Sequence, residues 1–121
     1  DFVGDFESGL LSQFNLTKAF IPYAKKFVML NGGAALKPRE GAGHVSVSDA
    51  GQMMLGKVVS TEQQDTEFVQ LILCGSVSKG RLKPIEITDA VDKLLNSKIQ
   101  QDVVYVGDKA KEILGEILTA V

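Results

Sequence analysis

The sequence predicts an α+β domain: a mixed, mainly antiparallel sheet of about four strands, flanked by two N-terminal and two C-terminal helices. Three observations lead to this prediction. One run, Phe68–Cys74, is almost entirely apolar. Apolar residues recur at helical spacing near both ends of the chain. Between the ends, short apolar runs alternate with Gly, Pro and Asp, as in a meander of strands.

The run Phe68–Cys74 is expected to be the central strand. Gln70 is its only polar residue. Because successive side chains of a strand point to opposite faces, both faces of this strand are apolar, and both need cover from other elements.

Two N-terminal helices are predicted before it. The first covers Asp5–Phe14, and Asn15 or Thr17 can cap a second that continues to Leu30. Asn31-Gly32-Gly33 is expected to end the second helix, because Gly reaches the left-handed conformation that closes a helix.

The middle of the chain is predicted as a loop followed by strands. Residues 34–44 are rich in Gly and polar residues, and Val45–Val47 fits a brief strand. Met53–Val59 is predicted as a strand because of its paired valines and Gly56, which weakens a helix by about 1 kcal/mol. A helix over residues 49–59 fits the apolar spacing as well, so both interpretations stay open.

The C-terminal part is predicted to begin with a turn at Lys79-Gly80 and an edge strand over Leu82–Ile87, where Pro84 excludes a central position. A helix over Thr88–Ser97 then connects to a strand at Asp102–Val106. The clearest helical periodicity of the sequence follows Asp108 and runs to the end of the chain.

Length and composition set the class of protein. With 121 residues, the whole chain 1–121 is expected to form a single domain. Its net charge of −2 gives no reason to expect nucleic acid as a partner. No apolar run approaches the length of about 20 residues that spans a membrane. One cysteine excludes an internal disulfide, and the sequence leaves the cellular location open.

Candidate catalytic and ligand-binding residues are few. Cys74 and His44 are the sole Cys and His, so they form the one thiolate–imidazole pair that the composition allows. A buried, inert Cys74 is the more common outcome for such a residue. No spacing typical of metal ligands is present, and no cofactor motif either. Lys79, Arg81 and Lys83 form a small basic cluster that is a candidate anion contact.

The N-terminal segment carries an excess of aromatic and apolar residues for two helices beside a small, already covered sheet. Together with the positive mean hydropathy of +0.10, this excess indicates a surface that a partner covers. The predicted contact residues are Phe2, Phe6, Leu10, Phe14, Phe20 and Tyr23.

The sequence therefore predicts a non-enzymatic interaction or assembly subunit. It would associate with itself or dock another protein through its N-terminal aromatic helices and a sheet edge. The alternative is a domain that binds a small apolar ligand in a pocket under the loop 34–44. An enzyme that uses Cys74 and His44 is the third interpretation.

Overall fold

The computed structural model describes residues 2–75, 79–99 and 101–107, and the predicted helix after Asp108 lies outside them. The N-terminal helix runs continuously from Phe2 to Phe20. Its parts, and the elements that follow it, are α1 (Phe2–Asp5), the π-helical turn η1 (Phe6–Leu11), α2 (Ser12–Phe20), η2 (Ile21–Tyr23), β1 (Lys26–Gly32), η3 (Gly33–Ala35), α3 (Gly43–Glu62), β2 (Glu67–Leu73), α4 (Pro84–Leu95) and β3 (Val103–Val106).

The sheet of the described residues is parallel throughout and has the strand order β1-β2-β3. The prediction of a mainly antiparallel sheet of four strands was therefore wrong. Helices α3 and α4 each connect two neighbouring parallel strands, as in βαβ units, which need a long crossover connection instead of a tight turn.

Two segments have the opposite secondary structure from the one predicted. Lys26–Gly32, predicted as the end of a helix, is the strand β1, while Met53–Val59, predicted as a strand, lies inside α3. The open alternative of a helix over residues 49–59 was the correct one. Pro22 explains part of the first error, because it lies in the short turn η2 that separates the N-terminal helix from β1.

The central strand was predicted correctly. β2 lies between β1 and β3, and five of its consecutive residues, beginning with Phe68, are buried. Gly32 is the last residue of the strand β1 and Gly33 begins the turn η3, so this pair of glycines does not end a helix.

Pro84 begins α4, and the predicted edge strand over Leu82–Ile87 does not form. Proline is favoured at a first helical position, where its missing N–H would have no partner. Glu86 strengthens this start, because its Oε2 accepts from the Lys83 backbone N–H at 2.7 Å. The strand predicted at Asp102–Val106 is confirmed as β3.

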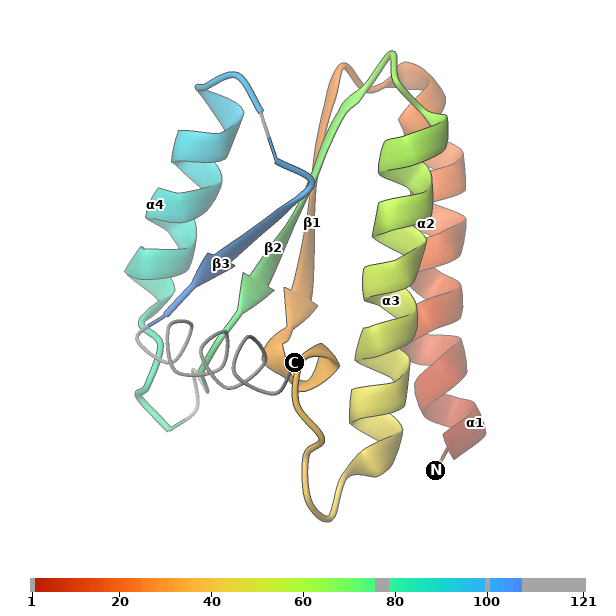
Figure 1. Ribbon diagram of the computed structural model, residues 1–121, viewed down its shortest axis with the longest axis vertical. Helices are drawn as coiled ribbons and strands as arrows, with labels where there is room; N and C mark the ends of the chain where they lie inside the picture. Colours follow the sequence, from red (N-terminus) through yellow and green to blue (C-terminus); the bar gives the residue numbers. More distant parts are fainter. Residues whose placement is uncertain (1, 76–78, 100, 108–121) are drawn as a thin grey trace, which may run out of the picture.

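Helices cover both faces of the sheet, in three layers (Figure 1). The N-terminal helix and α3 lie on one face, and α4 lies on the other. The face toward α3 carries Phe27, Met29, Phe68 and Gln70; Met29 and Phe68 form a buried cluster with Ile21. The connections β1–α3–β2 and β2–α4–β3 both step in the same direction across the sheet, but α3 and α4 lie on opposite faces. The two crossover connections therefore have opposite handedness. One of them departs from the usual right-handed rule.

Candidate functional site

The N-terminal helix packs closely against α3 through glycines. A Cβ atom at Gly9 would lie 2.8 Å from Ser48 Oγ, and one at Gly51 would lie 2.9 Å from Leu10 Cδ2. Both distances are too short for any residue larger than glycine unless the neighbour moves. Gly9 lies within the π-helical turn, which is rare in proteins and often occurs near functional sites.

Helix α3 has an inverted distribution of polar and apolar residues. Its buried stripe consists of Ser48, Gln52 and Gly56, which recur every four residues and therefore share one face. Exposed apolar side chains lie on the face away from the sheet: Val47, Met54 and Val58. A solvated helix shows the opposite arrangement, with its polar face outward.

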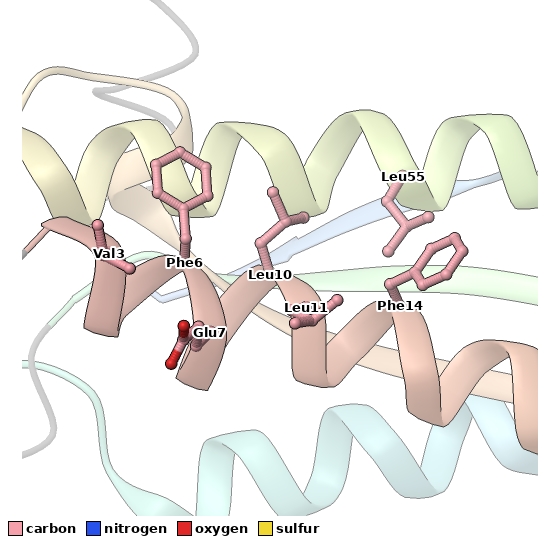
Figure 2. A pocket seen from close by; sticks show the side chains of 7 residues that line it. All are labelled: Val3, Phe6, Glu7, Leu10, Leu11, Phe14 and Leu55. Carbon is pink, nitrogen blue, oxygen red and sulfur yellow. The ribbon is translucent and has the colours of Figure 1, made fainter.

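The two helices enclose a hollow of about 410 Å³ on the surface away from the sheet (Figure 2). Phe6, Leu10 and Phe14 point from the N-terminal helix toward α3, and Leu55 points from α3 toward Phe14. Val3, Leu11 and Glu7 complete the lining. One carboxylate therefore lies at the margin of an otherwise apolar surface.

A second hollow of about 340 Å³ continues along the same pair of helices. Phe14 and Leu55 line both hollows, so this pair stands between them. The second hollow is lined by two charged side chains, Lys18 and Glu62, whereas the first is lined by Glu7. We call the surface along both hollows the outer face; it comprises Val3, Phe6, Glu7, Leu10, Leu11, Phe14 and Lys18 of the N-terminal helix, and Val47, Met54, Leu55, Val58, Val59 and Glu62 of α3.

Three of the predicted contact residues, Phe6, Leu10 and Phe14, lie together in the first hollow. Phe20 and Tyr23 are exposed but line neither hollow. The side chain of Phe2 lies outside the described part of the structure. The sequence interpretation missed the contribution of α3, because it assigned the segment around Met54 and Leu55 to a strand.

The basic cluster Lys79, Arg81 and Lys83 lies just before α4, and its contact with an anion stays a prediction. Lys79 and Arg81 are exposed. Lys83 stands directly before α4, where the Glu86 carboxylate already accepts from its backbone N–H. A carboxylate thus occupies the position at which the helix N-terminus would attract an anion.

Cys74 is fully buried directly after β2, and its Sγ lies 3.8 Å from the Ile72 carbonyl oxygen. Burial raises the pKa of the Cys74 thiol. A reactive cysteine needs a lowered pKa and access to solvent, so both observations favour an inert thiol. His44 lies in the first turn of α3.

Polar side chains gather where β1 ends. Asn31 is buried; its Nδ2 donates to the Asp49 carbonyl oxygen at 3.0 Å, and its Oδ1 accepts from the Gly32 N–H at 2.8 Å. Burial raises the pKa of the Asp49 carboxyl group, and the positive charge of Arg39 partly opposes this rise. These contacts fix the start of α3 against the sheet.

The remaining predictions concern pockets, metals and membranes. Neither hollow is lined by a residue of the loop 34–44, under which an apolar ligand was expected to bind. Among the described residues, no group of three His, Cys, Asp or Glu side chains is arranged to hold a metal ion. No helix in that part of the chain has the length and apolar character needed to cross a membrane.

Taken together, the fold is a small three-layer α/β arrangement, and its most distinctive surface is the apolar outer face. Comparison with known proteins adds no assignment: no family model, no curated protein and no solved structure gives a significant match to this chain.

Proposed function

We propose that the chain is an assembly subunit that associates with a second copy of itself through the outer face. One observation carries the proposal: two adjacent helices both turn apolar side chains away from the sheet at the same place. Phe14 is 46% exposed, Leu11 49% and Met54 60%. Covering such a surface stabilises a complex by about 25 cal/mol per Å² of apolar area removed from water.

The charges of the outer face favour a second copy over an unrelated partner. Glu7 and Lys18 lie toward opposite ends of the N-terminal helix; Glu7 lines the first hollow, and Lys18 lines the second together with Glu62 of α3. A twofold axis near Gln13, midway between Glu7 and Lys18, would run the two N-terminal helices antiparallel, so that Glu7 of each copy approaches Lys18 of the other. A twofold interface must be self-complementary in this way.

The test is the mass of the protein in solution over a wide concentration range, measured by sedimentation equilibrium. We expect a dimer whose dissociation constant rises at least about tenfold when Met54→Glu places a charge on the outer face, a change of about 1.4 kcal/mol. Ile85→Glu is the matched control, because Ile85 is also 60% exposed but lies on α4, across the sheet. The control should leave the dissociation constant unchanged.

The antiparallel arrangement has its own test. Glu7→Lys and Lys18→Glu should each weaken the dimer, because each places like charges opposite one another, and the double exchange should restore it. A strict monomer at high concentration, or equal effects of Met54→Glu and Ile85→Glu, would refute self-association through this face. Two single exchanges with no effect would refute the arrangement alone.

A further inference from the structure

A second surface, independent of the outer face, is the edge of β1 that faces away from β2. Within the described residues, β1 pairs with β2 alone. The Glu67 N–H donates to the Lys25 carbonyl oxygen, and the backbone groups of a strand point alternately to its two sides. Lys26, Val28 and Leu30 therefore direct their N–H and C=O groups toward the open edge.

The open edge has a defined end. The Gly32 N–H also belongs to the outward-pointing set, but it donates to Asn31 Oδ1 at 2.8 Å. The last outward-pointing N–H of the strand, that of Gly32, is therefore already bonded to the side chain of Asn31. The backbone groups that remain available extend from Lys26 to Leu30.

The position of the N-terminal helix leaves room beside this edge. α3 packs on β1 and β2, and the N-terminal helix lies next to α3 in the same layer, with Ile21 reaching Met29 of β1. Packed helices lie about 8–10 Å apart, whereas neighbouring strands lie about 4.8 Å apart. A helix one position beyond α3 therefore extends past β1, over the place of a further strand.

The side chains around this place are apolar. Leu16 and Phe20 are 47% and 55% exposed and lie on the flank of the N-terminal helix opposite to Phe14, since each residue turns the helix by about 100°. Leu30 is exposed on β1 itself. An additional strand next to β1 could bury the apolar side chains of one of its faces against Leu16 and Phe20. The apolar side chains of its other face would lie next to Leu30.

We propose that the open edge of β1 accepts a further parallel β-strand with apolar residues on both faces, supplied by a separate polypeptide. A parallel orientation continues the pattern of the sheet, because both described strand pairs are parallel. A second copy is the wrong occupant, since twofold pairing of two β1 edges would be antiparallel.

The first measurement is amide hydrogen exchange of the whole chain, resolved residue by residue by NMR. We expect the amides of Lys26, Val28 and Leu30 to exchange at least about tenfold faster than those of Phe27, Met29 and Asn31. Equal exchange rates for the two sets would overturn the proposal. Protection of the first set that grows with protein concentration would overturn it too, because it would reveal pairing between copies.

The second measurement adds a probe strand. The probe is a short peptide of alternating valine and isoleucine with lysine at both ends, N-methylated at every second residue so that it pairs along one edge only. We expect it to slow exchange at Val28 and Leu30, and a spin label at its C-terminus to broaden the Leu30 signals more than those of Lys26. The control is the same peptide N-methylated at every residue, which should do neither.

Equal protection by the two peptides, or no protection by either, would overturn the proposal. Stronger broadening at Lys26 would show antiparallel binding and would also overturn it. The variant Val28→Pro supplies a further check, since proline there removes an outward donor and no hydrogen bond to β2. This variant should keep the exchange protection of Met29 and lose that given to Leu30 by the peptide.

Discussion

The two faces of the sheet hold their helices by different means. On the face toward α3, the interior contains buried polar side chains, among them Gln70, Asn31 and Gln52. Gln70 Nε2 donates to the Met53 carbonyl oxygen at 2.7 Å, and Asn31 Nδ2 donates to that of Asp49. On the face toward α4, the side chains of β2 are apolar: successive residues of a strand alternate between the two faces, so Val69 and Leu71 point to this side, and both are fully buried.

The difference teaches how position is specified in so small a domain. Apolar contacts are non-directional, so they allow a helix to shift along a sheet. Two amide hydrogen bonds to the backbone of α3 fix its height and rotation. α4 is attached by one cation instead: Lys26 Nζ donates to the carbonyl oxygens of Leu94 and Leu95 at 3.1 and 3.2 Å and to that of Ser97.

The largest expected effect tests the polar face. Gly56 lies against the fully buried Gln70, and a Cβ atom there would come within 2.7 Å of Gln70 Cγ and closer still to Cδ and Nε2. We expect Gly56→Ala to lower the free energy of unfolding by about 3 kcal/mol, because it overpacks the contact and displaces the hydrogen bond to Met53. Urea unfolding measures this loss.

Gly43→Ala is the matched control for this prediction. Gly43 also lies in α3, but a Cβ atom there meets nothing within 4 Å. Its free energy of unfolding should stay within about 0.5 kcal/mol of the parent value. If Gly56→Ala is tolerated as well as the control, α3 is not fixed by its close approach to Gln70.

Gln70 itself gives the next largest effect. Its Oε1 has no hydrogen-bond partner among the described residues, which costs stability, while its Nε2 is satisfied by Met53. Gln70→Ala should cost about 2 kcal/mol, the low end for a large-to-small substitution, because it also removes the unpaired oxygen. Gln70→Met should cost less than about 1 kcal/mol, because it keeps the volume.

The ratio of these two losses separates packing from hydrogen bonding. Equal losses for Gln70→Ala and Gln70→Met, measured by thermal and urea unfolding, would mean that the bond to Met53 matters more than the volume of the side chain. In that case, the polar face would owe its stability to the hydrogen bond itself.

A smaller effect is expected on the opposite face. Lys26→Met should lower the free energy of unfolding by about 1 kcal/mol, because it removes the cation from the C-terminal carbonyls of α4 and from Glu67, 3.3 Å away. Lys25→Met, which changes an exposed neighbour, is the control. Faster amide exchange confined to the last turn of α4 would identify the cause, whereas a uniform change would contradict it.

The same contrast explains what the sequence could predict. β2 was identified because an apolar residue occupies nearly every position, a pattern that survives any arrangement of its neighbours. Met53–Val59, a part of α3, was assigned to a strand because of its paired valines and Gly56. In the structure Gly56 belongs to the inward stripe with Ser48 and Gln52, where a glycine is needed for packing, so it does not mark the absence of a helix. In β1, the consecutive apolar residues Phe27 to Leu30 fit a helix and a strand equally well.

Helical spacing placed Phe6, Leu10 and Phe14 on one face of a helix, and in the structure they line one hollow, because that periodicity holds within one continuous helix. Their contact with a partner stays a prediction. Leu55 and Met54 were missed, since their place beside the N-terminal helix depends on tertiary packing through Gly9 and Gly51. The exposed apolar residues of α3 were the available signal, but they acquire meaning as a surface only once the buried stripe is known.

The smallest expected effect concerns pH. Burial raises the pKa of Asp49, and Arg39 partly opposes the rise. In the folded chain the carboxyl therefore keeps its proton to a higher pH than in the unfolded chain, where the pKa is about 3.9. Between these two pKa values the folded state binds more protons, so the free energy of unfolding falls as pH rises through this window and stays lowered above it.

Asp49→Asn removes this dependence, because an amide does not ionise. Above the pH range between the two pKa values of Asp49, we expect the variant to have a higher free energy of unfolding than the parent. Below this range the two free energies should approach each other, as measured by urea unfolding from about pH 4 to about pH 7. Arg39→Met in the parent should increase the loss of stability with rising pH, since it removes the positive charge that opposes the rise of the Asp49 pKa. Asp65→Asn, an exposed residue of the turn before β2, corrects for the change in net charge. Parallel curves for the parent and Asp49→Asn would mean that the polar cluster at the end of β1 holds α3 without any cost from its buried carboxyl group.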